Sequence, residues 1–214
     1  MAHYGVLFLD ELPEFSRNNL EVLREPLEDG EITIGRASQV ITYPCQFMLV
    51  ASMNPCPCGF YGSDKECNCT DENIKKYLNK ISGPLLDRID IQVEVSSVKY
   101  ESISCETKEE SSEQIRERVN AARKIQKKRY ESLSIFSNSE LTPSMIEEFC
   151  KLDSSGKLIM KNAFEKLGLS ARAHDRILKV ARTIADLDGS KNIMNAHLLE
   201  AIQYRSLDRK FIGR

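Results

Sequence analysis

Two adjacent carboxylates follow a short apolar run near the beginning of the chain, where they could act on a nucleotide. Residues 5–9 read Gly-Val-Leu-Phe-Leu, and Asp10 and Glu11 come directly after them. An apolar run of this length is typical of a strand buried on both faces of a parallel sheet, and such sheets bind ligands at the carboxyl ends of their strands. One carboxylate could then hold Mg²⁺ while the other orients the attacking water. The alternative is a core strand that runs into a solvated turn.

Four cysteines in two tight pairs form the second group of residues with a chemical pattern. Cys56 and Cys58 are separated from Cys67 and Cys69 by eight residues. Four thiolates at one place suit tetrahedral Zn²⁺ in a structural site, because no coordination position is left open for chemistry. The alternative is four ordinary reduced or oxidation-prone thiols. We expect the other cysteines to be packing or surface residues: Cys45, Cys105 and Cys150.

Composition narrows the class of protein. The chain has 214 residues, of which 29% are charged and 41% hydrophobic, which fits one large or two small globular domains. A net charge of −2 argues against a generally basic nucleic-acid coat but leaves room for a local patch. No apolar stretch approaches a membrane span, and the first residues lack signal-peptide character. We therefore expect no membrane partner. The seven cysteines are an odd number and four of them lie in two tight pairs, so we expect a reducing, cytoplasmic location with a metal site.

Residues 1–95 have the pattern of an α/β domain that would position both groups. Apolar spacing predicts a helix over 13–29, ended by Gly30. Alternating residues predict a hairpin from 31–34 and 39–42, and further strands are predicted at 47–51 and 89–95.

The remainder reads as a linker at 96–113 and a helical domain at 114–214. Ser111 and Gln114 form a capping-box pattern for a helix to about Tyr130. Further helices are predicted from Thr142-Pro143 through Cys150, from Ser154 to Leu167 before Gly168, after a Ser170 cap, and after an Asn195 cap. The inward residues predicted for the last two are Ile177, Val180, Ala181, Ile184 and Leu187, then Leu198, Leu199 and Ile202.

Several motifs occur in an order that resembles a known family: GVLFLDEL, LREPLEDGEITI, VASMNPCPCG, GPLLDRID, LSARAHDRILKVARTIADL and AIQYR. Over essentially the whole chain they are similar to the magnesium-chelatase-like AAA+ ATPases. The most similar subgroup is ComM/YifB, bacterial proteins linked to natural transformation and DNA branch migration. The resemblance implies the C-terminal part of a parallel-sheet P-loop core followed by an all-α lid. It also implies a homo-oligomeric ring, expected to be a hexamer, that uses ATP and Mg²⁺ and acts on DNA.

The resemblance assigns roles to three residues of the first domain. Asp10 and Glu11 match the Walker B motif, with Asp10 as the Mg²⁺ partner and Glu11 as the base that activates water. Asn54 matches the sensor that contacts the γ-phosphate or the water. Taken alone, an Asn before a Pro often only caps a turn.

Three arginines also match positions with roles in the family. Arg88 in GPLLDRID matches the arginine finger offered to the neighbouring subunit, and Arg172 in LSAR matches the second sensor on the lid, with Arg176 as the alternative. Without the resemblance, a local ion pair with Asp87 or Asp90 would explain Arg88. A solvated helix face shared with Asp175 would explain Arg172 and Arg176.

One family motif is missing from this sequence. The chain contains no G-x-x-x-x-G-K-[ST] loop to hold the β- and γ-phosphates. The family places that loop upstream of Walker B, so we expect the chain to be the C-terminal part of a longer protein. Alone, it should be a poor or inactive ATPase.

Contacts to nucleic acid are predicted at two places. Arg36 lies at the tip of the predicted hairpin, which points into the central pore of related rings, and a basic stretch covers 116–129. Such basic runs more often face water. Two functions of other kinds stay open: a chelatase-type motor that remodels a protein partner for Mg²⁺ insertion, and a non-enzymatic zinc-bearing interaction module.

Overall fold

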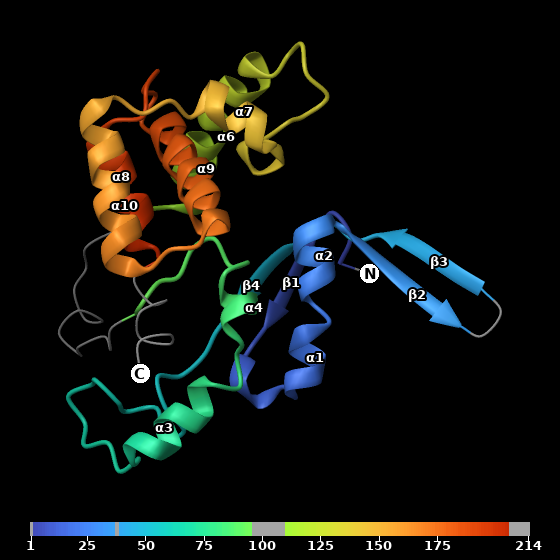
Figure 1. Cartoon of the computed structure of the whole chain (residues 1–214), viewed down its shortest axis with the longest axis vertical. Helices are drawn as coiled ribbons and strands as arrows, with labels where there is room; N and C mark the ends of the chain where they lie inside the picture. Colours follow the sequence, from blue (N-terminus) through green and yellow to red (C-terminus); the bar gives the residue numbers. More distant parts are fainter. Residues whose placement is uncertain (1, 37–38, 96–109, 206–214) are drawn as a thin grey trace. The chain divides into compact units, whose positions relative to one another are not determined.

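The computed structural model describes residues 2–36, 39–95 and 110–205, which fall into two compact units. The first contains residues 2–36, 39–89 and 95, and the second contains 90–94 and 110–205. Short strands and helices are mixed in the first unit, whereas the second is helical (Figure 1). Most of the predicted linker lies outside the described residues. No helix in the described parts has the length and apolar character needed to cross a bilayer.

A small parallel sheet positions the carboxylates. β1 (Val6–Leu9) pairs in parallel with β4 (Met48–Ala51), and the register sets Leu9 opposite Ala51. Both strands were predicted, but burial on both faces was wrong. Leu9 packs against a core that contains Leu12, whereas successive side chains of a strand point to opposite faces and the other face is open. The exposed side chains of that face are Val6, Phe8, Met48 and Val50.

The predicted helix over 13–29 is broken into shorter pieces. A 3-10 turn, η1 (Leu12–Glu14), is followed by α1 (Arg17–Glu21) and α2 (Arg24–Asp29). Pro26 explains the break, because it has no N–H to continue the helical hydrogen bonds from the preceding turn. The predicted end is confirmed: Gly30 closes α2 in the left-handed conformation, with a φ of 70°.

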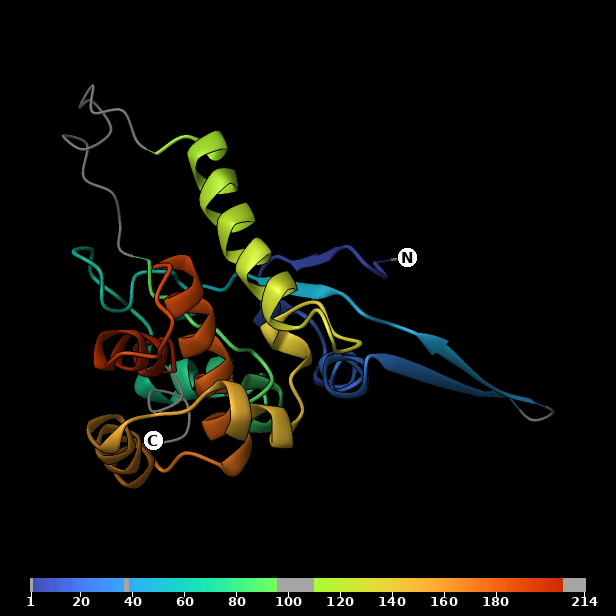
Figure 2. The same cartoon turned by 90° about the horizontal axis from the view of Figure 1, so that it is seen from above.

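The predicted hairpin is confirmed. β2 (Glu31–Arg36) and β3 (Gln39–Pro44) pair antiparallel, with Thr33 opposite Thr42 and their hydroxyls 3.0 Å apart. Residues 37 and 38 of the turn lie outside the described part. In both views the hairpin projects from the rest of the first unit (Figure 1 and Figure 2).

Two further helices follow the cysteines. They are α3 (Asp71–Leu78) and α4 (Gly83–Leu86), and neither was predicted from the sequence. α4 and the connection before it build the core of the first unit with residues of η1 and α1: Leu12, Leu20, Ile81, Leu85 and Leu86. The strand predicted at 89–95 is wrong, since this segment has no strand conformation. A strand needs a partner, and here the Gln92 amide donates instead to the carbonyl of Tyr204, 2.9 Å away.

The second unit contains five helices in its described residues, and Figure 2 shows α6, in green to yellow, along its length. They are α6 (Ser112–Arg129), α7 (Pro143–Phe149), α8 (Ser154–Leu167), α9 (Ala171–Leu187) and α10 (Asn195–Gln203), with a 3-10 turn η2 (Asn138–Glu140). The predicted helices and the Ser111 capping box are confirmed. Gly168 ends α8 with a φ of 62°, and the Ser170 hydroxyl caps α9.

Three details of the helical prediction were wrong. The N-cap of α10 is Met194; Asn195 is instead the first helical residue, and its amide group donates to the Ser155 hydroxyl, 2.8 Å away. Leu187 and Leu199 are 39% and 49% exposed, because each lies at the edge of its helix's apolar stripe. The other predicted inward residues are buried or pack against the core.

A buried polar network holds the helices of the second unit together. The Asp186 carboxylate on α9 pairs with Arg129 from α6 and with Arg182 one turn away, and it accepts a hydrogen bond from Asn138 at 2.9 Å. Burial raises the pKa of Asp186, but the hydrogen bonds from Arg129 and Asn138 outweigh burial, so its pKa lies below the ordinary value. The network stays ionised because its charges are paired.

Candidate functional site

The first predicted carboxylate is fixed by a residue from the neighbouring strand. Asp10 follows β1, and its Oδ1 accepts hydrogen bonds from the Ser52 hydroxyl and from the Glu11 amide. Ser52 follows β4, and its amide donates to the carbonyl of Leu9 at 3.0 Å. Because the two parallel strands end together, these side chains meet at the carboxyl edge of the sheet. Carboxylate and hydroxyl oxygens are hard ligands of the kind that Mg²⁺ takes.

Glu11 occupies an unusual backbone conformation. Its φ is 52° and its ψ 51°, the left-handed region that residues with a Cβ seldom adopt. The turn is held by the amide of Leu12, which donates to the carbonyl of Ser52 at 2.9 Å. The side chain of Glu11 is exposed. Left-handed conformations of non-glycine residues cluster at functional sites, so this turn is a candidate for one.

Asn54 lies three residues beyond β4, after the same carboxyl edge of the sheet that the two carboxylates follow. Tyr77 on α3 is only 7% exposed, and the Asn54 backbone is among the groups that shift the pKa of its phenol. Burial and the charges of Glu14 and Glu11 raise the pKa of Tyr77, the Asn54 backbone lowers it, and the net shift is upward. Tyr77 therefore lies near both Asn54 and the carboxylate turn.

Arg88 is held within its own unit. Its Nε donates to the carbonyl of Arg24 at 3.1 Å and lies 3.2 Å from Oε2 of Glu28, and its Nη1 donates to the carbonyl of Pro84 at 2.7 Å. The side chain is 9% exposed. The ion pair is local, as the alternative interpretation expects, and it is made with Glu28 from α2.

The other predicted arginines lie away from the carboxylate turn and Arg88 in the sequence. Arg172 is exposed in the first turn of α9, and Arg176, one turn on, pairs with Asp90 at 2.6 Å. Both belong to the second unit. Arg36 is the last residue of β2, opposite Gln39, and its side chain lies outside the described part of the structure.

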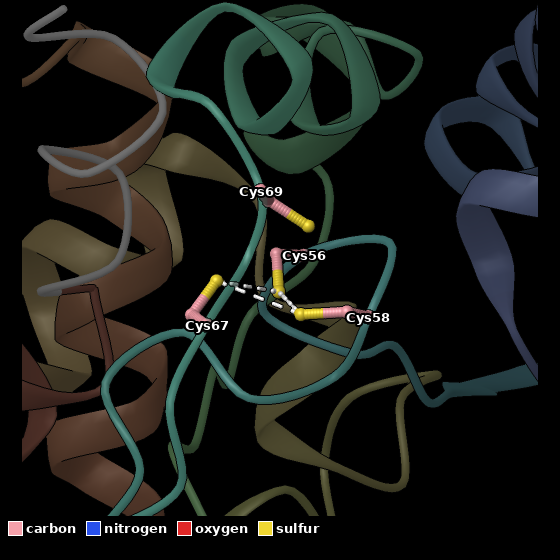
Figure 3. A group of neighbouring side chains, drawn as sticks. All are labelled: Cys56, Cys58, Cys67 and Cys69. Carbon is pink, nitrogen blue, oxygen red and sulfur yellow. Dashed lines mark hydrogen bonds between the residues drawn. The ribbon is translucent and has the colours of Figure 1, made fainter.

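The structure brings the four predicted cysteines together (Figure 3). The sulfur of Cys56 lies 3.4 Å from that of Cys58 and 3.7 Å from that of Cys67, and the Cys58 and Cys67 sulfurs are 3.5 Å apart. All four sulfurs, Cys69 included, lie within 4.8 Å of one another. With Zn–S bonds of about 2.3 Å, a tetrahedral site separates its sulfurs by about 3.8 Å. The spacing therefore fits a tetrathiolate metal site and is too long for disulfides.

The protonation of these thiols also suits a cation. A backbone hydrogen bond from Phe60, with one from the Cys56 side chain, lowers the pKa of Cys58 to about 6. A backbone hydrogen bond from Cys69 acts to lower the pKa of Cys67, but burial and the neighbouring thiols raise it to about 12. Crowded thiolates repel one another, so one ionises easily and others do not. A bound divalent cation would allow all four to ionise.

Two residues of this region were missed by the sequence reasoning. Ser52 could have been found by aligning the ends of the two predicted parallel strands, which sets it beside Asp10. Tyr77 lies on the unpredicted helix α3, whose signals are the Thr70 cap followed by apolar residues at Ile74 and Tyr77. Because the cysteine pattern dominates that segment, the helix after it was overlooked.

Two family descriptions match the sequence. "Magnesium chelatase, subunit ChlI" matches residues 1–103, and "Magnesium chelatase, subunit ChlI C-terminal" matches residues 109–205.

Relatives from several bacteria are similar over almost the whole chain. "Uncharacterized protein YifB" of Escherichia coli is 47% identical over 213 residues, which cover 99% of this chain and 41% of that protein. "Competence protein ComM" of Haemophilus influenzae is 46% identical over 98% of this chain and 40% of its own length. "Uncharacterized protein Mb2921c" of Mycobacterium bovis is 38% identical over 95% of this chain and 40% of its own length. The chain thus spans about two fifths of the length of these relatives.

Proposed function

Since the chain belongs to the magnesium-chelatase-like family of the ComM and YifB proteins, we propose that it forms part of the nucleotide-hydrolysing centre of a ring-forming AAA+ ATPase. The observation that carries the proposal is the carboxyl edge of the β1–β4 pair. There Asp10 is fixed by Ser52, and Glu11 is held at a positive φ. In parallel sheets this edge is where ligands bind.

Each residue of this edge has a chemical task in the proposal. Bound Mg²⁺–ATP supplies a phosphoanhydride that water can attack and a cation that spreads its negative charge. Asp10 offers a carboxylate oxygen to the cation, and its hydrogen bonds from Ser52 and Glu11 keep it in one orientation. Glu11 accepts the proton of the attacking water. Asn54 donates from its side-chain amide to the γ-phosphate or orients the water.

The arginines act at subunit boundaries and on the lid in this proposal. Arg88 stabilises negative charge on the nucleotide of the next subunit in a hexameric ring, and a guanidinium suits that task because it is always charged. When the ring assembles, Arg88 would then give up its ion pair with Glu28 and its hydrogen bonds to two carbonyls, and would contact phosphate instead. Arg172, with Arg176 as the alternative, reports on the nucleotide through motion of the helical unit.

Hydrolysis would drive remodelling of DNA. Support comes from the similarity to a protein named for competence and from the projecting β2–β3 hairpin, which ends at Arg36. A basic side chain at a hairpin tip can enter a pore and displace counterions from phosphate.

The four cysteines bind one structural Zn²⁺ in this proposal. The donor set is a complete tetrathiolate, and the loop from Cys56 to Cys69 contributes only Cys56 to the buried apolar side chains of the described structure. A metal supplies the stability that such a loop cannot gain from a core of its own.

ATP-dependent branch migration on a synthetic four-way DNA junction tests the proposal, with a full-length protein that carries this segment. We expect migration with ATP and Mg²⁺, and none with Glu11→Gln, which should still bind the junction. Chelatase-type function, favoured by the family description, would appear instead as Mg²⁺ insertion into a porphyrin with a protein partner. A zinc-bearing interaction module would bind its partner without nucleotide. Either result, together with no migration, would overturn the proposal.

A further inference from the structure

The basic residues of α6 have no role in the proposed function, and the structure divides them into paired and unpaired ones. Arg118 pairs with Glu110, with its Nη1 2.6 Å from Oε1, and Arg129 pairs with Asp186 in the buried network. Within the described residues, the other basic side chains of the helix form no ion pair: Arg116, Arg123, Lys124, Lys127 and Lys128.

Three of these unpaired side chains lie in line on one face of the helix. Because the helix has about 3.6 residues per turn, spacings of seven and four residues bring Arg116, Arg123 and Lys127 into one row. Asn120 lies in the same row, and all four residues are exposed. Arg123 donates to Oε1 of Gln126 at 3.3 Å, a bond that leaves its charge uncompensated. We call these four residues the α6 row, which is about 16 Å long at a rise of about 1.5 Å per residue.

The adjacent face of α6 has the mixed charges of an ordinary solvated helix face. Lys124 and Lys128 lie there together with Glu113 and Glu117, at spacings of four, seven and four residues. The α6 row, in contrast, contains no acidic residue. Its positive charge is therefore not offset along the face that carries it.

Stabilisation of the helix itself accounts for only one of the three charges. Cations stabilise a helix when they lie in its last turn, which includes Lys127 but neither Arg116 nor Arg123. Every side chain of the first half of α6, residues 112–121, is exposed, and in Figure 2 this half extends beyond the other helices of the second unit. The row is therefore accessible along its whole length.

We propose that the α6 row binds the phosphate backbone of duplex DNA. Three positive charges in line match a chain of regularly spaced phosphates, and their neutralisation releases counterions. The helix contains no aromatic side chain on which an unpaired base could stack, which favours a duplex over a single strand. Since phosphate contacts carry no sequence information, binding should not depend on base sequence. The inference rests on the proposed function only for the choice of DNA as the polyanion.

Fluorescence anisotropy of a labelled DNA duplex mixed with the 214-residue chain, without nucleotide, tests the row. At about 50 mM salt, the combined variant Arg116→Gln, Arg123→Gln and Lys127→Gln should bind about tenfold more weakly than wild type, or worse. The slope of log K against log salt concentration should become shallower by about 3, because each lost phosphate contact removes about 0.9.

Two further combined variants separate the row from net charge and from folding. Lys157→Gln, Lys161→Gln and Lys166→Gln remove the same charge from exposed positions of α8 and should change the affinity by less than about twofold, because salt screens distant charges. Arg116→Lys, Arg123→Lys and Lys127→Arg keep the charge of the row and should bind as tightly as wild type. Circular dichroism should show the same helix content in all variants.

A single strand of the same sequence should bind more weakly than the duplex, and so should polyglutamate of equal charge, which represents an acidic protein surface. Equal or tighter binding of either probe, unchanged affinity of the glutamine variant of the row, or an equal loss in the α8 variant would overturn the proposal. If a full-length protein that carries this segment fails to migrate junctions while the row still binds duplex, the proposed function fails and the row stands. Junction migration together with unchanged affinity of the row variant would refute the row alone.

Discussion

The hydroxyl of Ser52 donates a hydrogen bond to Oδ1 of Asp10, which joins the first residue beyond β4 to the first residue beyond β1. The bond follows from the strand register, because Leu9 and Ala51 lie opposite each other in a parallel pair. It orients a carboxylate that would otherwise rotate freely in solvent. The turn that carries Glu11 begins from this fixed point.

Replacing Glu11 by glycine should stabilise the chain. Glu11 has a φ of 52°, and releasing an L-residue from the left-handed region is worth roughly 1 kcal/mol. We expect Glu11→Gly to raise the free energy of unfolding by about that amount in urea titrations followed by circular dichroism. Glu11→Gln keeps the Cβ and should leave the free energy of unfolding unchanged. A lower stability for the glycine variant would show that the turn is not strained.

Removing the central charge of the helical unit should be costly. Asp186→Asn leaves the buried Arg182 and the partly buried Arg129 without their carboxylate, and breaking a buried pair costs about 3–5 kcal/mol. Glu165→Gln, which breaks the exposed pair with Lys161, is the control and should cost less than about 1 kcal/mol. If thermal unfolding showed equal losses of stability in Asp186→Asn and Glu165→Gln, the stabilising role of the network would be contradicted.

Acidification should weaken the same network. The pKa of Asp186 is lowered in the folded chain, so its contribution to stability is present above the unfolded pKa of about 3.9 and is lost as pH falls through the folded value. The difference in unfolding free energy between wild type and Asp186→Asn should therefore be largest near pH 7. It should shrink below about pH 4. A difference that stays constant down to pH 2 would contradict the lowered pKa.

The metal should depend on the clustered cysteines alone. Zinc measured by elemental analysis should be one atom per chain for wild type, and cobalt replacement should give the thiolate charge-transfer absorption of a tetrahedral site. Cys58→Ser should lose most of the metal. Cys45→Ser, outside the cluster, should keep it. If wild-type protein purified without a chelator contained no metal, the zinc site would be contradicted.

Local signals in the sequence predicted much of the fold. Caps and glycines placed the helices of the second unit, because these signals act within one turn of the chain. Gly168 and Ser170 are examples, and both end or begin helices as expected. The signals that predicted the hairpin were equally local. Burial was harder to predict, since it depends on what covers each face: Phe8 has the pattern of a core residue but lies on the open face of the sheet.

Contacts between distant segments explain most of what was missed. Glu28 could not be named as the partner of Arg88 without knowing that α2 passes beside α4. Segment 89–95 alternates apolar and polar residues like a strand but has no partner strand in the described structure. The strand prediction based on this alternation was therefore wrong. The cysteine cluster was predictable because its ligands are few, close in sequence and chemically distinctive.

The most direct measurement is steady-state ATP turnover by a full-length protein that carries this segment, compared between wild type and Glu11→Gln. Because Glu11 is proposed to take the proton of the attacking water, we expect turnover to fall by about 100-fold or more while ATP binding is retained. Turnover unchanged in the glutamine variant would place hydrolysis elsewhere and contradict the assignment of this carboxylate edge.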